Sequence, residues 1–219
     1  VVYPFGYGLS YTDFEWSDFS VTEKNDIFTV RVTVKNVGNR AGKDVVQIYY
    51  QAPYTPGGIE KASVNLVQFA KTKKLAAGES QTLEISFYKE DMKSYDYKNE
   101  QTYVLDEGTY YITAATDAHN AVNNILKAKG AKGLDGVGYA NMVQHFELSR
   151  VLYNEGANGV SVKNRLQHAY DESLTVLSRS DWAKTYPTID GTPSNIKSED
   201  GERGAVIYTK PGSMSLAQK

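Results

Sequence analysis

The sequence contains no cysteine in its 219 residues, so neither a disulfide framework nor a cysteine-ligated zinc site can form. The formal net charge is −2, and lysine and arginine are scattered among the acids, which argues against the basic stripe typical of nucleic-acid-binding proteins. No apolar run reaches the ~18–20 residues that a membrane-spanning helix needs. We therefore expect neither nucleic acid nor a membrane as a partner.

Motifs of cofactor and metal chemistry are missing as well. His119, His145 and His168 lie far apart and follow no metal-ligand spacing. The sequence has no phosphate-binding loop, no dinucleotide fingerprint and no Gly-x-Ser-x-Gly elbow, and the glycines within 130–138 indicate a loop. We expect no metal and no cofactor. The lack of cysteine leaves the compartment open, and we prefer the bacterial cytoplasm to secretion.

What the sequence has is a series of short strand patterns. In residues 27–36 the even positions from Phe28 to Val34 are apolar and the odd positions from Thr29 to Lys35 are polar, the alternation of a half-buried strand. A second pattern begins at Phe14 and loses its alternation near Asp18. Glycine, asparagine or proline separates most of the patterns, as turns require. The expected strands cover 14–21, 27–36, 43–51, 64–74, 81–87, 92–97, 102–105 and 109–116.

Seven or eight short strands at this spacing predict an all-β fold, a two-sheet sandwich of immunoglobulin or fibronectin type III kind. We assign the sandwich to residues 1–117. Residues 118–188 form a mixed, partly helical C-terminal extension and connector, in which 118–129 has helical spacing and Gly130 stands at the stop. Residues 189–219 are polar and are expected to form a flexible tail.

Four ordered motifs carry a family resemblance. They are YPFGYGLSYT at 3–12, VKNVGNRAGKDVVQIY at 34–49, LAAGESQ at 75–81 and EGTY at 107–110. Together they resemble the fibronectin type III-like domain of glycoside hydrolase family 3, the β-glucosidase and β-xylosidase family. The resemblance covers about residues 1–117. It implies a non-catalytic accessory module of a longer, bacterial β-glucosidase-like enzyme that removes terminal β-linked sugars.

The resemblance also implies the module's main partner, the catalytic domains of the same parent chain. Tyr3, Phe5 and Tyr7 would pack along the border with a preceding domain, or alternatively cap the sandwich's own core. Residues 177–188 resemble the connector of rearranged family members, in which the sandwich comes before the barrel domain. There Trp182 and Tyr186 would anchor a linker on a neighbouring domain.

Carbohydrate is left open as a second partner. The proline- and glycine-rich connection 52–63 holds Tyr54, which can stack on a sugar, and Glu60 and Lys61, which can bond hydroxyl groups. In some relatives the matching loop reaches toward the catalytic cleft, which makes a sugar-facing role possible here. An ordinary solvated loop is the competing interpretation.

Two further functions remain as alternatives. A self-standing glycan-binding or adhesion sandwich would show a row of exposed aromatics on one sheet face. An autonomous hydrolase would use Asp181, which lies in a Ser-Asp-Trp string like that of the family's nucleophile. That nucleophile needs a (β/α) barrel and a partner acid, and residues committed to a sandwich leave no room for a barrel. We therefore expect no catalytic residue in this chain and no enzyme activity from the chain alone.

Overall fold

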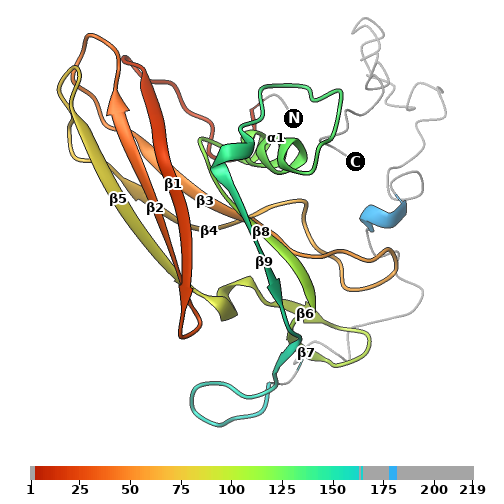
Figure 1. Cartoon of the computed structure of the whole chain (residues 1–219). Coiled ribbons are helices and arrows are strands. Elements are labelled where there is room, and N and C mark those ends of the chain that lie inside the picture. The colour runs from red at the N-terminus through yellow and green to blue at the C-terminus, as the bar shows by residue number, and fades with distance from the viewer. Residues whose placement is uncertain (1–2, 163, 165–177, 182–219) are drawn as a thin grey trace, which may run out of the picture.

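The computed structural model describes residues 3–162, 164 and 178–181. In these residues ten strands form three antiparallel sheets, accompanied by one α-helix (Figure 1). This confirms the predicted fold class, a mostly β architecture built around a two-sheet sandwich. No helix in the described part of the chain is long and apolar enough to cross a membrane.

The first sheet of the sandwich has three strands in the order β1-β2-β5, namely β1 (Phe14–Lys24), β2 (Ile27–Asn36) and β5 (Ser80–Tyr88). The predicted irregularity in β1 is a bulge, because the pairing register shifts between Ser17 and Ser20 and Asp18 has a positive φ of 55°. The strand runs three residues beyond its predicted end. A two-residue turn of Asn25 and Asp26, both with positive φ, keeps β1 paired with β2 as far as Lys24.

The second sheet has four strands in the order β4-β3-β8-β9, namely β4 (Asn65–Lys71), β3 (Val45–Gln51), β8 (Gly108–Ala115) and β9 (Val143–Leu148). A third, small sheet has the order β10-β7-β6, namely β10 (Val151–Tyr153), β7 (Thr102–Leu105) and β6 (Ser94–Asp96). Three short 3₁₀ turns complete the description: η1 (Lys89–Met92), η2 (Ala140–Met142) and η4 (Arg179–Asp181).

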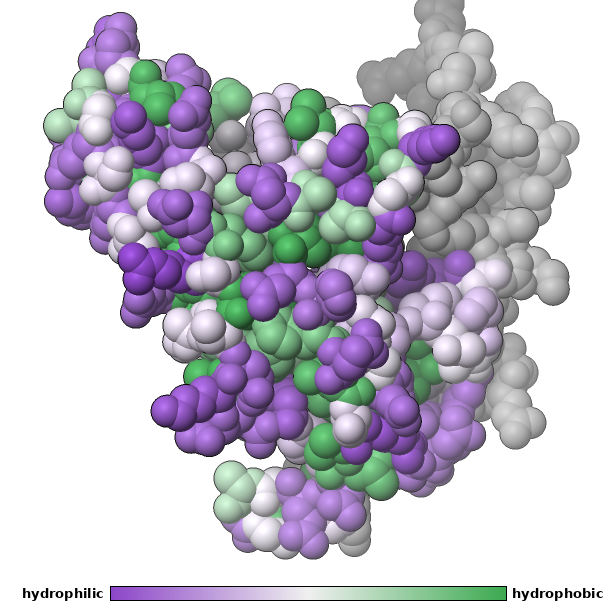
Figure 2. All heavy atoms as spheres, viewed as in Figure 1, coloured by the Kyte–Doolittle hydropathy of each residue, from purple (hydrophilic) through white to green (hydrophobic). Residues whose placement is uncertain are grey.

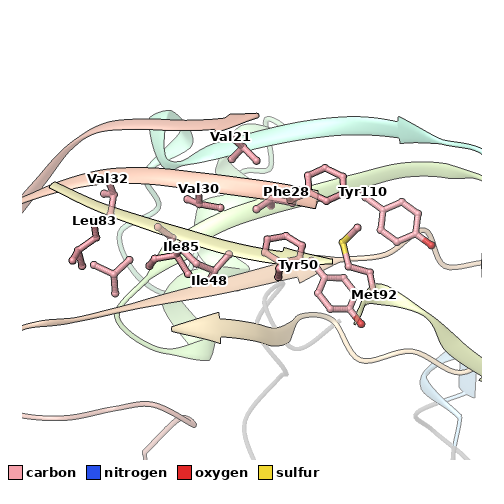
Figure 3. Packing of buried hydrophobic residues seen from close by; sticks show 14 of the residues in the cluster. Val21, Phe28, Val30, Val32, Ile48, Tyr50, Leu83, Ile85, Met92 and Tyr110 are labelled. Atoms are coloured by element: carbon pink, nitrogen blue, oxygen red, sulfur yellow. The ribbon is translucent and has the colours of Figure 1, made fainter. Parts of the chain in front are cut away.

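The core lies between the two sandwich sheets (Figure 3). The alternation predicted for β2 is confirmed, since Phe28, Val30, Val32 and Val34 are all fully buried. Phe28 stacks on Phe87 of β5 and meets the edge of Phe146 of β9, with ring centroids 5.4 and 5.1 Å apart. One aromatic side chain therefore joins both sheets.

Strand β9 extends the sandwich beyond residue 117, where the sequence analysis ended it. It pairs with β8 from Gly108↔Leu148 to Thr113↔Val143. Its period is hard to see in the sequence because Gln144 is among its half-buried residues. The Gln144 side-chain amide accepts from the backbone N–H of Val21 and donates to its carbonyl oxygen, both at 2.9 Å. This polar pair ties β9 to β1 across the two sheets.

The helix α1 (Ala118–Ala128) confirms the predicted helical segment, and Gly130 follows its C-cap with a positive φ of 76°. Asp117 caps its N-terminus by accepting from the backbone N–H of Asn120 at 2.9 Å. The helix packs on the outer face of the second sheet, where Ala121 contacts the cluster of Tyr49 and Ala115. Strand β3 is consequently buried on both faces.

Candidate functional surfaces

The connection between β3 and β4, residues 52–64, contains the three residues predicted to face a sugar. Lys61 does not face solvent, because its side chain is only 4% exposed. Its ammonium forms an ion pair with Asp106 and donates a 2.8 Å hydrogen bond to the carbonyl oxygen of Pro53. The positive charge is therefore used inside the loop, where it joins the two ends of the connection to the turn before β8.

Glu60 is also engaged within the chain. Its carboxylate accepts a hydrogen bond from the Ser178 hydroxyl and another, at 3.2 Å, from the backbone N–H of Arg179. Arg179 Nη1 in turn donates to the carbonyl oxygen of Lys61 at 3.1 Å. Two segments about 118 residues apart in the sequence therefore meet at this loop.

Tyr54 lies beneath the same arginine. The Arg179 guanidinium carbon is 4.3 Å from the centroid of the Tyr54 ring, a cation–π arrangement. The Tyr54 hydroxyl is buried and has no hydrogen-bond partner among the described residues. One ring face that could stack on a sugar is consequently covered.

A second cation, Lys129, is influenced by the charge of Arg179. Lys129 bonds to Gln51 and lies 4.2 Å from the centroid of the Tyr111 ring. Burial lowers the pKa of Lys129, and the nearby charge of Arg179 lowers this pKa further. The Tyr54 ring and the carboxylate of Glu60, which accepts from the backbone N–H of Arg179, oppose this repulsion.

The N-terminal segment shows where the predicted border residues lie. The side chains of Tyr3, Phe5 and Tyr7 are 66%, 68% and 47% exposed, and the rings of Tyr3 and Tyr7 are 5.0 Å apart. Their exposure does not favour the interpretation that they cap the sandwich's own core, and their role at a domain border stays a prediction. Leu9 and Tyr11 in the same segment are exposed as well.

The backbone of this segment is nevertheless held against the sandwich. The Phe5 carbonyl oxygen accepts from the N–H of Ala118 at 2.9 Å, and that of Gly6 accepts from the Gln47 amide at 3.1 Å. Gly6 has a positive φ of 84°, a conformation that favours glycine, and a Cβ there would displace the side chain of Gln47. Tyr49 donates to Gln47 Oε1 at 2.7 Å. The aromatic rings thus project from a fixed backbone.

Other predicted residues fall elsewhere. Trp182 and Tyr186 lie outside the described residues. Asp181 ends the turn η4. His119 lies 3.2 Å from the Asp135 carboxylate, and His145 lies beside the ring of Tyr111. The part of the chain that the structure describes contains no group of three or more histidine, aspartate or glutamate side chains that could hold a metal ion.

Two surface features were missed by sequence reasoning. One is a groove of about 990 Å³ between the N-terminal segment, the start of β3 and the helix layer, lined among others by Trp16, Asp44 and Tyr139. Trp16 donates to Asp44 at 2.6 Å, while burial raises the pKa of that carboxyl. The residues that line the groove come from segments far apart in the sequence, so no sequence motif could reveal it.

The other missed feature is a row of tyrosines across the small sheet. Tyr95 of β6 and Tyr153 of β10 both pair with Tyr103 of β7. The rings of Tyr95 and Tyr103 meet edge to face at 5.2 Å, and Lys93 Nζ lies 5.4 Å from the Tyr103 centroid. Tyr103 is 39% exposed. Elsewhere the surface seen in Figure 2 alternates between small apolar patches and hydrophilic residues.

Comparison with known proteins agrees with this architecture. A family model described as a fibronectin type III-like domain matches residues 44–118. β-Glucosidase A of Butyrivibrio fibrisolvens is 38% identical over 217 residues, which cover 90% of this chain and 24% of that protein. A β-glucosidase of Ruminococcus albus is 42% identical over 125 residues, which cover 55% of this chain and 13% of that protein. The chain thus spans a quarter or less of either relative.

Solved structures give the same result. β-Glucosidase 3B from Thermotoga neapolitana, in complex with α-D-glucose, superposes with a TM-score of 0.54 at 29% identity, over 69% of this chain and 18% of that one. A β-glucosidase from Kluyveromyces marxianus superposes with a TM-score of 0.55 at 27% identity, over 70% of this chain and 16% of that one. In both cases the likeness covers a minor part of a much longer protein.

Proposed function

We propose that this chain, which matches a fibronectin type III-like family model over residues 44–118 and is similar to parts of longer β-glucosidases, is the accessory module of a β-glucosidase-like glycoside hydrolase family 3 enzyme. The module has no catalytic role of its own. The complete enzyme hydrolyses terminal β-linked sugars by double displacement, with both carboxylates outside this chain. The module holds the catalytic domains in their relative positions.

One observation carries this proposal. The rings of Tyr3, Phe5 and Tyr7 are largely exposed, although the backbone that bears them is hydrogen-bonded to β3 and α1. A rigid backbone that presents apolar rings to solvent suits a docking surface, because burying those rings against a partner releases water without a large ordering cost. The catalytic part of the same polypeptide is the partner that the relatives suggest.

The architectural role has a physical basis in catalysis. Catalytic groups on separate domains must meet a sugar in a narrow range of positions, and a displacement of about 1 Å can reduce the rate on the order of a hundredfold. A module that buries apolar surface against both domains restricts such displacements. The alignment of 90% of this chain with one β-glucosidase supports the view that the residues after the sandwich belong to the same accessory module.

The first test uses the 219-residue chain alone. We expect no hydrolysis of an aryl β-glucoside above the buffer rate. Turnover that the Asp181→Asn variant abolishes would instead establish the chain as an autonomous hydrolase and contradict the proposal.

The second test uses the complete enzyme, encoded by the open reading frame around this sequence. Replacing Tyr3, Phe5 and Tyr7 by serine should lower kcat/KM for the same substrate by roughly tenfold to a hundredfold. The Phe69→Ser variant, which alters a 60% exposed ring on β4, is the matched control and should keep normal activity. Equal activity of both variants would show that the aromatic segment holds no domain in place.

A second candidate function is binding of glycans by the sandwich itself, and the tyrosine row on the small sheet favours it. Tyrosine rings can stack on sugars, and Tyr103 is the most exposed of the three. Calorimetric titration of the chain with cello-oligosaccharides tests this function. Binding that is lost in Tyr103→Ala would support this function, and the absence of measurable binding by the wild-type chain would contradict it.

A further inference from the structure

The contacts between the connection 53–61 and the segment 178–181 identify a binding site whose ligand is part of this chain. We propose that the loop Pro53–Lys61 is a docking site for the arginine of the C-terminal connector, and that Arg179 rather than a sugar occupies it. We call these contacts between residues 53–61 and 178–181 the clasp; they join segments more than a hundred positions apart in the sequence.

The site matches the chemistry of a guanidinium group. Such a group is planar, stacks on aromatic rings and carries N–H donors at its edge. Here the ring of Tyr54 lies under its face at 4.3 Å, and the carbonyl oxygen of Lys61 accepts from its edge at 3.1 Å. An ammonium group could not satisfy both contacts, because it lacks the flat face and the spread donors.

Glu60 fixes the backbone that carries this arginine. Its two carboxylate oxygens accept separately from the Ser178 hydroxyl and from the N–H of Arg179. Ser178 Oγ also accepts from the N–H of Ser180 at 3.1 Å, which shapes the turn that follows. Both the side chain and the backbone of Arg179 are therefore recognised by the loop.

The loop is prepared for this ligand by contacts of its own. The buried ammonium of Lys61 binds Asp106 and the carbonyl oxygen of Pro53, which holds the first and last residues of the loop together. A preformed site loses less conformational entropy when its ligand docks. The carboxylate of Asp106, in the turn before β8, and the carbonyl oxygen of Pro53 offset the cost of burying the Lys61 charge, independently of Arg179.

Two consequences follow for the rest of the protein. With the guanidinium on its ring, Tyr54 cannot stack on a sugar through that face, so this loop is not a carbohydrate site while the clasp is closed. The clasp also fixes residues 178–181 beside the connection between β3 and β4. That this anchoring helps to position a catalytic domain rests on the proposed function, whereas the clasp itself does not.

The clasp can be tested by distance measurement, because a cysteine-free chain accepts labels at chosen positions only. Spin labels at Thr55→Cys and Ser180→Cys, both exposed sites, report the separation of the two segments by double electron–electron resonance. We expect one narrow, short distance distribution. It should broaden and shift to longer distances when Arg179→Ala or Glu60→Ala is added.

Arg150→Ala is the matched control, since it removes an arginine paired with Glu100 outside the clasp, and it should leave the distribution unchanged. Arg179→Lys should behave like Arg179→Ala if the flat guanidinium is what the loop recognises. A broad distribution before any clasp residue is changed, or a narrow one that survives both alanine variants, would overturn the inference.

Trypsin provides an independent measurement that needs no label. Cleavage after Arg179 requires the residue to leave the loop, so its initial rate, followed by mass spectrometry, should rise severalfold in Glu60→Ala. An unchanged rate would contradict the clasp. Neither experiment involves a glucoside substrate, so failure of the clasp and failure of the accessory role can be told apart.

Discussion

Two packing interfaces of this protein are stabilised in different ways. One lies between the two sandwich sheets, and the other lies between α1 and the outer face of the second sheet. The first is apolar and is filled by alternating side chains such as Val30, Ile48 and Ile85 (Figure 3). The second buries two asparagines, Asn123 and Asn124, and brings the glycine-rich loop 130–139 against the helix. Apolar burial needs no specific partner, whereas a buried amide does.

This difference predicts which buried positions tolerate substitution and which do not. In an apolar core the change in unfolding free energy depends on the side-chain volume removed or added, and neighbouring side chains can partly adjust to a substitution. In the helix layer the change in unfolding free energy depends on individual hydrogen bonds and on close backbone contacts that leave no room for a side chain. Three predictions probe the contrast and a fourth extends it to the small sheet, in decreasing order of expected effect.

The largest effect should come from Phe28→Ala. Phe28 is fully buried and contacts aromatic rings of both sheets, so its removal leaves a cavity that costs about 3–5 kcal/mol of unfolding free energy. Urea denaturation followed by tryptophan fluorescence measures this. Phe69→Ala, at an exposed ring, is the control and should change the midpoint very little. Similar losses in the two variants would mean that the inter-sheet core is not the main source of stability.

Gly138→Ala should come next. A Cβ at Gly138 would lie 2.4 Å from the backbone oxygen of Asn123 and 2.8 Å from Lys127 Cβ, so the loop would have to move away from α1. We expect a loss of about 2–3 kcal/mol, as for other overpacked sites. Gly8→Ala is the control, since a Cβ there meets no atom within 4 Å. Faster amide hydrogen exchange confined to α1 and its loop would locate the damage.

The two buried asparagines form a matched pair for the third prediction. Asn124 donates to Thr113 and to the Ala114 carbonyl oxygen and accepts from the N–H of Tyr139 at 2.8 Å. Neither polar side-chain atom of Asn123 has a partner among the described residues.

Asn124→Ala should therefore cost about 1–2 kcal/mol, because it leaves buried partners unpaired. Asn123→Ala should cost clearly less, because no bond within the described residues is lost. Thermal unfolding of the two variants in parallel gives the comparison. An equal loss in both would indicate that volume, and not hydrogen bonding, governs this layer.

The smallest expected effect concerns acid stability of the small sheet. Asp96 is buried at the end of β6 and accepts from the backbone N–H groups of Lys98 and Asn99, both at 3.0 Å. Burial alone would raise the pKa of Asp96, but hydrogen bonds from the backbone of Asn99, Glu100 and Lys98 and from the Asn99 side chain together bring it below the usual value. Stability from this carboxylate is therefore present above the unfolded-state pKa and is lost as the pH falls through the lower, folded-state value.

Asp96→Asn should accordingly be less stable than wild type by about 1 kcal/mol near neutral pH, since the bonds to a charged acceptor are weakened. The deficit should shrink as the pH falls below about 4, where Asp96 of the unfolded wild-type chain becomes protonated, and should be smallest below the lower pKa of the folded state. Urea midpoints measured at several pH values test this. A constant difference across that range would show that the charge of Asp96 does not contribute.

Sequence-based prediction succeeded where structure depends on nearby residues and failed where it depends on distant ones. The β2 alternation was predicted correctly because each residue's face depends only on its neighbours two positions away. The helix 118–128 was predicted because its spacing and Gly130 lie within one short segment. Strand β9 was not, since half-buried Gln144 obscures the apolar period and its partner β8 lies about thirty residues earlier.

The predicted site residues show this even more clearly. The sequence marked Tyr54, Glu60 and Lys61 as polar or aromatic residues in an exposed loop, where contact with a sugar was a reasonable expectation. Nothing within that loop indicates that Lys61 turns inward to Asp106, or that Arg179 covers Tyr54. Whether Tyr3, Phe5 and Tyr7 meet another domain stays a prediction, which their exposure supports.

By itself the sequence determined the all-β class, most strands and the helix that ends before Gly130, because each of these depends on interactions among residues close together in the chain. Only the tertiary structure decided that β9 completes the second sheet and that the loop 53–61 receives Arg179. Those outcomes depend on which distant segments meet, and residue types alone do not specify the pairing of side chains separated by more than a hundred positions.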